Sequence, residues 1–382
     1  MSVPADDPQF LASPKHERPH QKSRALFQHP ANSQFVKQSG VAKDSEQHAI
    51  EADGRTVLVS SPDKMFFSTR GETKLDLINY YLSVAEPFMA AMRGRATMLQ
   101  RFPDGAEGNS FYQKRVPAGT PDWVETTTVE TPNGTPSNAL VLADMAHLVW
   151  AVNLGCLGFH PWPYLAADPS NTDELRIDLD PQPGVSFDDV RRSALAVRVV
   201  LGELGLTGFP KTTGNRGIHI YVRVTSGYDS FTVRYAAVAL ARELERRHGD
   251  FMTAAWWKEE RGQRVFIDFN QNAPHKTVFG PWCVRSRPGA EVSAPLSWDE
   301  LMTDVMPEDL TIGTVPALVA KRGNPWATMN DNPQPLEPLM ELHRRDWANG
   351  MLDAPWPPVY PKQPNEPPRV SPSRAKKPTT PS

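Results

Sequence analysis

The sequence predicts a globular protein in which strands and helices alternate and pack around mixed sheets. Its 382 residues, 39% of them hydrophobic, are enough for two lobes with a substantial core. Between residues 175 and 284, segments of strand-like alternation are interleaved with segments of helical period. No run approaches the roughly 18 apolar residues that cross a bilayer, and the start has no signal-peptide pattern. We therefore expect a cytoplasmic protein with no membrane partner.

The first half of the folded region is predicted to hold short strands and two long helices. Apolar residues recur at helical spacing over residues 73–92, which predicts one amphipathic helix. Residues 126–130 followed by Asn133-Gly134 indicate a hairpin. Ser137 can then cap an apolar helix at residues 139–154. Further strands are predicted at residues 55–60, 97–100 and 110–114.

The second half shows the alternation most clearly. Ser186, with Asp189 three residues later, resembles a capping box, and Gly205 stands where the following helix should end. The helices of this half are predicted at residues 186–204 and 231–247, and its strands at residues 175–180, 217–224, 265–270 and 277–284.

Both ends of the chain are predicted to be disordered tails. Residues 1–50 have no hydrophobic period, and residues 353–382 are rich in proline and basic at their end. The formal charge is −3, and its acidic excess falls between the tails. That excess alone argues against a nucleic-acid partner, although clustered cations can override it. Cys156 and Cys283 are the only cysteines, which excludes a cysteine zinc site and argues against a disulfide framework.

Three aspartates carry the clearest chemical signal. In the predicted strand RIDLDP, alternation sends Asp178 and Asp180 to one face, about 7 Å apart. Asp268 lies opposite Ile267 and Phe269 in another predicted strand. If the strands are neighbours, the three carboxylates converge and must take up protons or bind divalent cations, for which oxygen ligands favour Mg²⁺ or Mn²⁺. Alternatively, Asp178 and Asp180 only open the turn that begins at Pro181.

A glycine-rich segment supplies a second signal. Residues 211–217 (KTTGNRG) precede a predicted strand, and free backbone N–H groups in such a turn can hold phosphates beside Arg216. His219 falls on the polar face of that strand. The alternative is an ordinary turn with a structural histidine.

An arginine pair supplies a third signal. Arg285 and Arg287 are two residues apart on a predicted strand, hence on one face, which suits a triphosphate. The alternative is a solvated pair at a strand end. The three signals occur together in one α/β unit, and this coexistence favours the functional interpretation.

Together these motifs resemble the polymerase domain of bacterial ligase D, a member of the archaeo-eukaryotic primase superfamily. The resemblance covers about residues 50–330 and implies an α+β, two-lobed primase-polymerase fold with an RRM-like catalytic mixed sheet. It implies DNA contacts mainly in residues 51–160 and metal and nucleotide sites mainly in residues 161–330 of a domain spanning 51–350. The matching stretches are residues 58–67, 101–105, 110–114, 139–153, 176–181, 213–219 and 265–272.

The resemblance also implies roles for individual residues. Asp178, Asp180 and Asp268 correspond to a catalytic triad that binds two divalent ions, Mn²⁺ or Mg²⁺. The positions implied for nucleotide binding are His160, Thr213, Asn215, Arg216, His219, Arg261, Gln271, Arg285 and Arg287. Those implied for DNA binding are Lys64 and Lys74, at a 5′-phosphate, and Phe111 and Tyr112, which stack on bases. The sequence departs from the family at Gln100, where relatives often carry lysine, and at Asn215, where serine is frequent.

The implied function is that of a template-directed repair polymerase, a nucleotidyltransferase that adds nucleotides, preferentially ribonucleotides, to a primer 3′-hydroxyl. Its expected partners are gapped duplexes or broken DNA ends with a 5′-phosphate, nucleoside triphosphates, and in end joining Ku and a separate DNA ligase. No Lys-x-Asp-Gly ligase motif is found, so a stand-alone, nucleoid-associated polymerase is expected. Two alternatives stay open: a catalytically idle module that binds or bridges DNA ends, and a metal-dependent phosphodiesterase. The repair pathway is not decided by these residues.

Overall fold

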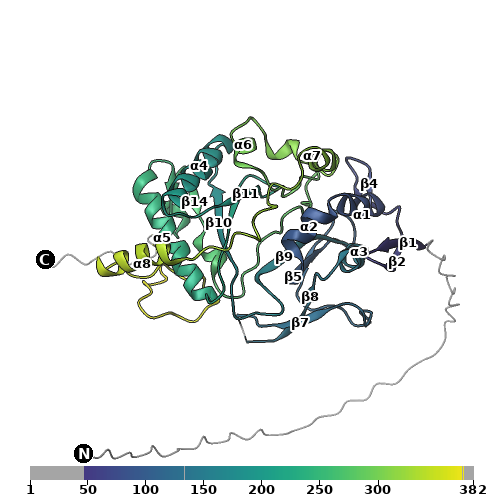
Figure 1. The fold of residues 1–382 in the computed structure, drawn as a ribbon, viewed down its shortest axis with the longest axis horizontal. Helices are drawn as coiled ribbons and strands as arrows, with labels where there is room; N and C mark the ends of the chain where they lie inside the picture. Colours follow the sequence, from purple (N-terminus) through teal and green to yellow (C-terminus); the bar gives the residue numbers. More distant parts are fainter. Residues whose placement is uncertain (1–46, 133, 372, 374–382) are drawn as a thin grey trace, which may run out of the picture. The chain divides into compact units, whose positions relative to one another are not determined.

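The computed structural model describes residues 47–132, 134–371 and 373, and it contains two five-stranded sheets with helices packed against them (Figure 1). Residues 174–267 build one sheet and residues 95–165 build the other. The α+β class expected from the sequence is confirmed. Most of the expected N-terminal tail, residues 1–46, lies outside the described residues.

The RRM-like sheet has the strand order β11-β12-β10-β14-β13. Its elements follow a strand–helix–strand–strand–helix–strand sequence, and β10 is antiparallel to both β12 and β14. β13 pairs with β14 in parallel, so the sheet is mixed. The elements are β10 (Glu174–Pro181), α4 (Phe187–Glu203), β11 (Phe209–Thr212), β12 (Ile218–Arg223), α5 (Ser230–His248), β13 (Met252–Thr253) and β14 (Val265–Ile267).

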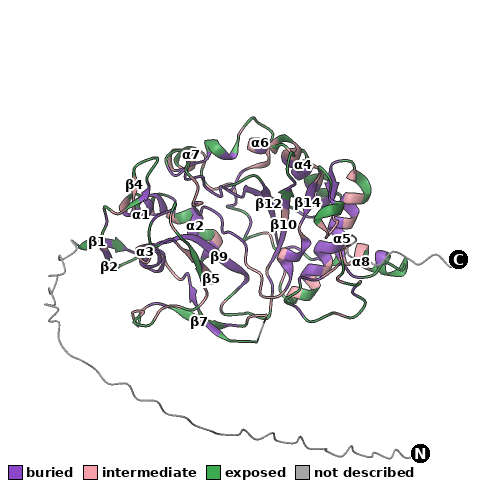
Figure 2. Ribbon diagram, turned by 180° about the vertical axis from the view of Figure 1, so that it is seen from behind, coloured by how far each residue is buried: buried purple, intermediate pink, exposed green. Residues whose placement is uncertain are grey.

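Helices α4 and α5 begin where their capping residues allow and pack on this sheet. Ser186 and Asp189 form the expected capping box at α4, each side chain accepting a hydrogen bond from the other's backbone N–H. Asp229 caps α5 by accepting from the backbone N–H of Thr232. Strands β10, β12 and β14 are buried, whereas both helices expose part of their surface (Figure 2). The sheet is therefore held as a rigid support for residues on its other face.

The β5-centred sheet is built from the first half of the chain. β5 pairs with β6, β8 and β9, and β7 and β8 form the predicted hairpin. Helices α1, α2 and α3 contribute buried residues to the same core. The bounds are α1 (Lys74–Ser83), α2 (Ala85–Met92), β5 (Arg95–Arg101), β6 (Phe111–Gln113), β7 (Thr126–Val129), β8 (Ser137–Val141), α3 (Met145–Asn153) and β9 (Cys156–Leu165).

Buried arginines join the two sheets where β9 meets β10. Arg176 of β10 donates hydrogen bonds to the carbonyls of Pro161 (2.9 Å) and Trp162 (3.1 Å) in β9. Arg95 of β5 pairs with Glu174 of β10 at 2.8 Å. These contacts fix the strand that carries Asp178 relative to the β5-centred sheet.

The remaining elements are short or peripheral. None of the helices within the described residues is long and apolar enough to cross a membrane. The elements are β1 (Gln47–Ala52), β2 (Arg55–Ser60), β3 (Met65–Phe67), β4 (Glu72–Thr73), α6 (Trp298–Leu301), α7 (Val315–Arg322), α8 (Glu337–Ala348), and the 3-10 helices η1 (Lys258–Glu260), η2 (Phe269–Asn272) and η3 (Pro307–Asp309).

The structure corrects two predicted helices. Residues 73–92 form two helices rather than one, because the chain leaves helical geometry at Val84 (ψ 22°) and Pro87 cannot donate a hydrogen bond across the break. The helix predicted at residues 139–154 starts at Met145 and is capped by Asp144. Residues from Ser137 to Val141 instead complete the β7–β8 hairpin.

Two predicted strands are also corrected. The strand predicted at residues 265–270 ends at Ile267, because Asp268 caps η2. The strand predicted at residues 277–284 is irregular and makes only an isolated bridge between Val284 and Val292 within the described chain. Asp268 therefore follows a strand instead of lying within one.

The proline-rich C-terminal segment differs from the expected tail. Residues 353–371 are described, and the segment contributes buried side chains, including Trp356 (0% exposed) and Tyr360. An expectation of disorder from residue 353 onward is therefore wrong for this part. The high proline content led to the wrong prediction of disorder, because the aromatic and charged side chains that attach this segment to the fold are few and far apart in sequence.

Candidate active site

Asp178 lies on β10, and Asp268 directly follows β14, the neighbouring strand of the RRM-like sheet. Leu179 of β10 is paired with Ile267 of β14, and the backbone N–H of Asp268 donates to the carbonyl of Asp178 at 2.9 Å. The Asp268 carboxylate accepts the backbone N–H of Asn270 at 3.0 Å as the N-cap of η2. Asp180 follows Asp178 by two residues on β10 and is exposed. The topology thus brings the three predicted aspartates to one place.

The pKa values of these carboxylates reflect burial and mutual repulsion. Burial, together with the charge of Asp178, raises the pKa of Asp268 to about 7. Burial also raises the pKa of Asp178 to about 6, against the opposing charges of Lys211 and Arg285. The pKa of Asp180 is raised by burial and by Asp178. This group accordingly favours protons or cations.

His219 and Lys211 form the side of the site on β12 and β11. His219 Nε2 lies 3.3 Å from Asp178 Oδ1, whereas its buried Nδ1 has no hydrogen-bond partner in the described chain. Burial lowers the pKa of His219 well below its usual range, and Lys211 and Arg285 lower it further. Asp178 therefore faces a neutral imidazole. This contact gives Asp178 a neighbour that the alternative, in which it only opens the turn at Pro181, does not require.

Lys211 is a residue that the sequence analysis did not select. It is fully buried and pairs in register with His219, and its Nζ donates to Ser293 Oγ at 2.5 Å. Burial lowers its pKa well below the usual value, with Arg285 contributing. The sequence shows Lys211 at the start of the KTTGNRG segment, but it does not show that Lys211 is buried beside Asp178, because that position depends on tertiary structure.

The glycine-rich turn closes on itself beside the aspartates. Thr213 Oγ1 accepts hydrogen bonds from the backbone N–H groups of Asn215 and Gly217, each at 3.2 Å. Gly214 has a φ of +67°, and a Cβ on Gly217 would lie 2.6 Å from the carbonyl oxygen of Leu179. Both glycines are therefore required by geometry, and Asn215 and Arg216 are presented to solvent.

The arginine pair is attached to this turn. Arg285 Nε donates to the Thr213 carbonyl at 2.8 Å, and Arg287 Nη1 donates to Asn215 Oδ1. Arg285 also stacks on Phe279, with 3.5 Å from its guanidinium carbon to the ring centroid. Burial lowers the pKa of Arg285 to about 10, so it is cationic at neutral pH. The pair reaches the turn from an irregular segment and not from the predicted strand.

Gln271 and Arg261 lie on the other side of the carboxylates. Gln271 Nε2 donates to Asp268 Oδ2 at 3.0 Å. Arg261 is held by the carbonyls of Ala255 (3.0 Å) and Trp256 (2.9 Å) and stacks on Phe266. Burial lowers the Arg261 pKa, while the charges of Asp268 and Asp180 oppose that change. Arg261 thus lies within electrostatic reach of two of the aspartates.

His160 connects the nucleotide motifs to the exposed aromatic pair on β6. Its ring lies edge-to-face with Tyr112 (5.3 Å between centroids) and with Phe279 (5.2 Å). Burial, followed by the charges of Arg285 and Lys211, lowers the His160 pKa to about 3. Phe111 and Tyr112 are 45% and 58% exposed, so each ring has exposed surface on which a base can stack.

The two lysines expected to contact a 5′-phosphate differ in availability. Lys74 is buried, and its Nζ donates to the Ser60 carbonyl (2.5 Å) and to Asn153 Oδ1 (3.2 Å). Lys64 is partly exposed and donates to the carbonyl of Pro103. Burial lowers the Lys74 pKa and Lys64 adds to the effect, so the two cations are neighbours. Only Lys64 is presented to solvent.

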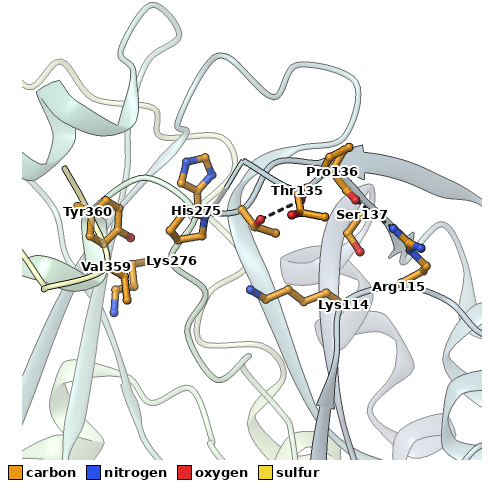
Figure 3. Close-up of a pocket in the computed structure, with 11 residues that line it drawn as sticks. Lys114, Arg115, Thr135, Pro136, Ser137, His275, Lys276, Val359 and Tyr360 are labelled. Atoms are coloured by element: carbon orange, nitrogen blue, oxygen red, sulfur yellow. Dashed lines mark hydrogen bonds between the residues drawn. The ribbon is translucent and has the colours of Figure 1, made fainter. Parts of the chain in front are cut away.

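A basic pocket of about 800 Å³ is lined by residues that follow β6 and by residues that follow η2 (Figure 3). Its cationic lining comes from Lys114 and Arg115 after β6 and from Lys276 after η2, and His275 also lines it. Lys276 is close enough to lower the pKa of Asp268. These cations escaped the sequence analysis because they converge only in the fold.

The described residues show no group of three or more Asp, Glu, His or Cys side chains placed to hold a metal ion together. The donor set nevertheless has the chemistry that a hard cation requires, since Asp178, Asp180 and Asp268 all offer carboxylate oxygens, and burial raises the pKa of each, with the charge of Asp178 adding to the effect on Asp180 and Asp268. An RRM-like sheet with Asp178 and Asp180 on β10 and Asp268 directly after β14, beside an arginine-bound glycine turn, defines a fold of the primase-polymerase class.

Comparison with known families makes the assignment specific. The family model described as "LigD, primase-polymerase domain" matches residues 73–326, and the chain belongs to this family. It is 30% identical over 247 residues to the multifunctional non-homologous end joining protein LigD of Mycolicibacterium smegmatis, covering 64% of this chain and 32% of that protein. It is also 30% identical over 286 residues to the bifunctional non-homologous end joining protein LigD of Bacillus subtilis, covering 74% and 45%.

A solved structure has the same fold. The polymerase domain of Mycobacterium tuberculosis ligase D in complex with DNA superposes with a TM-score of 0.68 at 27% identity, covering 72% of this chain and 99% of that one. The chain therefore spans nearly the whole of that domain but less than half of the two curated relatives described above.

Proposed function

We propose that this protein is a template-directed DNA repair polymerase that adds nucleotides to a primer 3′-hydroxyl at short gaps or broken ends. The observation that carries the proposal is the backbone hydrogen bond between Asp268, directly after β14, and Asp178 on the adjacent strand β10, next to the glycine turn bound by Arg285. Carboxylates suit the divalent ions of nucleotidyl transfer, and arginines at a turn suit a triphosphate. The two features lie on one face of the RRM-like sheet.

Asp178, Asp180 and Asp268 would hold two divalent ions, Mn²⁺ or Mg²⁺. When bound, such ions lower the pKa of the attacking hydroxyl and neutralise phosphate charge. The chain's own contribution is to hold the carboxylates: Gln271 and the Asn270 N–H fix Asp268, and His219 faces Asp178. Because His219 is neutral, it adds no positive charge to the ion site.

The nucleotide and the DNA would bind beside these carboxylates, with their sites meeting where His160 contacts Tyr112. Thr213, Asn215, Arg216, Arg285 and Arg287 would bind the triphosphate, with His160 beside the incoming base, His219 near the phosphates, and Arg261 and Gln271 toward the reacting end. Phe111 and Tyr112 would stack on the template, and Lys64 with Lys74 would contact the 5′-phosphate. The exposure of both aromatic rings supports their role.

The biological setting is proposed from the relatives' names. Two of them are named as non-homologous end joining proteins, and the solved domain was bound to DNA. We place this protein in the same repair process at the bacterial nucleoid, in the cytoplasm, with Ku and a DNA ligase as partners and nucleoside triphosphates as substrates.

We also propose a preference for ribonucleotides. The pocket around the turn is polar, and a buried polar group that loses its partner costs about 1–3 kcal/mol, which corresponds to roughly tenfold to hundredfold discrimination. We expect kcat/KM for a matched ribonucleotide to exceed that for the deoxynucleotide by this factor in single-nucleotide extension. Equal values would contradict the preference without affecting the polymerase assignment.

One assay separates the proposal from its alternatives. Labelled primer-template is incubated with Mn²⁺, with and without nucleoside triphosphates. A polymerase lengthens the primer only when nucleotides are present, a phosphodiesterase shortens it in either case, and an idle end-binding module leaves it unchanged. We expect lengthening that depends on the template sequence, and either of the other two results would overturn the proposal.

A further inference from the structure

The C-terminal strap, residues 353–360, packs against the turn that follows β14. It lies beyond residues 73–326, which match the family model, and it was expected to be disordered. Asp353, Trp356 and Tyr360 are all buried, with Trp356 0% exposed. The strap thus brings residues far along the chain to the back of the proposed active site.

Arg234 of α5 is the centre of the attachment. Its guanidinium is fully buried and donates to both carboxylate oxygens of Asp353, at 3.0 and 3.2 Å, and to the Ala354 carbonyl at 2.9 Å. Trp356 lies on the guanidinium at 3.8 Å, and its Nε1 donates to Asp353 Oδ2 at 2.7 Å. A buried charge pair with these additional hydrogen bonds has well-defined geometry.

Asn270 extends this network to the catalytic aspartate. Its Oδ1 accepts from Arg234 Nε at 2.7 Å, and its Nδ2 donates to the Pro355 carbonyl at 2.9 Å. The backbone N–H of the same residue donates to Asp268 Oδ1 at 3.0 Å. Asn270 is therefore held by α5 and by the strap while it holds Asp268.

A second attachment lies a few residues further along. The hydroxyl of Tyr360 donates to the Pro274 carbonyl, and Ala273 packs with Trp356 and Tyr360 in a small apolar cluster. Both ends of the segment from Asp268 to Pro274 are thereby tied to the strap. A turn carrying a carboxylate could otherwise move relative to β10.

We propose that the C-terminal strap is a positioning element of the active site, which fixes the Asp268 carboxylate toward the divalent ion through Asp353, Arg234 and Asn270. The inference rests on the proposed function, because it concerns the same ion site. Partners behind metal-binding side chains typically change metal affinity by 10–100-fold when removed. Asp353 is a positioning residue and does not touch substrate.

The test compares Asp353→Asn with the wild-type protein by calorimetric titration of Mn²⁺ in the absence of nucleotide and DNA. The substitution keeps the side-chain shape but removes the charge that pairs with Arg234. We expect Mn²⁺ binding to weaken about tenfold. In primer extension, the half-saturating Mn²⁺ concentration should rise by the same factor, while kcat at saturating Mn²⁺ and the Kd for gapped DNA stay within about twofold.

Asp346→Asn is the matched control, because Asp346 of α8 is also a buried carboxylate, and its ion pair is with Arg345 rather than Arg234. It should leave Mn²⁺ binding unchanged.

If Asp353→Asn fails to fold, Tyr360→Phe is tested instead. This change removes only the hydroxyl contact with Pro274, and we expect Mn²⁺ affinity to fall about threefold. Equal Mn²⁺ affinity of wild type and the strap variant would overturn the inference.

A double variant tests whether the residues act in series. If Asp353 acts through Asn270, then Asp353→Asn combined with Asn270→Ala should weaken Mn²⁺ binding no more than the worse single change. Fully additive losses would contradict the proposed chain of contacts. A wild-type protein that neither binds Mn²⁺ nor extends a primer would overturn the proposed function instead, so the two failures are distinguishable.

Discussion

At the scale of single residues, the candidate active site concentrates carboxylates whose pKa values stay raised despite the nearby cations. The side chains of Asp178 and Asp268 are both largely hidden from water, which raises the pKa of each, and the charge of Asp178 adds to the effect on Asp268. A protein with no use for this pair would gain stability by losing one carboxylate. This argument gives two predictions that concern Asp268.

The first prediction is that Asp268→Asn removes activity but stabilises the metal-free protein. The folded-state pKa of Asp268, about 7, lies above the value of roughly 4 expected in the unfolded chain. Wild-type stability is therefore lost as pH rises between these values, and at pH 8 the full cost is present. Asparagine does not ionise, so in EDTA at pH 8 we expect the variant to be more stable by about 1–3 kcal/mol.

Two measurements check this prediction. Chemical denaturation in EDTA should show the stability gain at pH 8 and little difference near pH 4. Primer extension with Mn²⁺ should fall about a thousandfold at pH 8. A variant that is less stable than wild type at pH 8, or one that keeps its activity, would show that the Asp268 charge has another role.

The second prediction is that Mn²⁺ binding weakens as pH falls. Metal and proton compete for the same oxygens, and Asp268 and Asp178 become protonated below pH values of about 7 and 6. We expect the Kd for Mn²⁺ to rise about tenfold between pH 8 and pH 6. Titration calorimetry across this range provides the measurement, and a Kd that is independent of pH would contradict the ion-binding role of both groups.

At the scale of elements, the glycine turn is the part of the site with the least tolerance for change. A Cβ on Gly217 would approach the Leu179 carbonyl to 2.6 Å, and that carbonyl belongs to the strand that carries the aspartates. The third prediction is therefore that Gly217→Ala displaces the turn and lowers kcat/KM for the nucleotide about a hundredfold. Steady-state kinetics with varied nucleotide concentration measure this loss.

Gly202 of α4 offers the matched control. A Cβ there has no neighbour within 4 Å, and the residue lies in a helix, where alanine is favoured over glycine by about 0.5–1 kcal/mol. Gly202→Ala should keep full activity and raise the free energy of unfolding. If Gly217→Ala keeps wild-type kinetics, the turn does not hold the triphosphate.

The elements also show what the sequence could predict. Periodic apolar patterns and capping residues located α4, α5, β10 and β12 closely, because those signals are local and agree with the fold. The failures occurred where non-local contacts decide: β8 pairs with β7 instead of joining the helix that follows, and the turn after β14 takes its conformation from Asp268 as a cap. The buried Lys211 and the strap anchored by Arg234 could not be found for the same reason.

At the scale of the whole molecule, the small negative charge conceals a separation of charge. The formal charge is −3, yet Lys114, Arg115 and Lys276 converge at the basic pocket, and Lys64 lies at the surface beside Lys74. Affinity for DNA depends on such local clusters and not on the sum of charges. The composition therefore did not exclude a nucleic-acid partner.

The fourth prediction concerns how the molecule recognises a gap. Lys74 is occupied by backbone and side-chain oxygens of the β5-centred half, whereas Lys64 is partly exposed, so we expect Lys64 to make the main contact with a 5′-phosphate. Wild type should bind a gapped duplex about tenfold more tightly with the phosphate than without it, since a charged hydrogen bond contributes about 1.5–3 kcal/mol. Lys64→Ala should lose this preference but still extend an open primer.

Lys74 should respond differently, because its ammonium group is buried and its loss leaves the Ser60 carbonyl without this donor. Lys74→Ala should lower the free energy of unfolding by about 1–3 kcal/mol, and any loss of phosphate preference should be smaller than that of Lys64→Ala. Lys321→Ala, which changes an exposed lysine of α7, is the control and should leave both properties unchanged. Binding titrations on matched duplexes with and without the 5′-phosphate measure the phosphate preference of each variant, and denaturation measures its stability. A wild type that binds both duplexes equally would refute gap recognition while leaving the polymerase assignment intact.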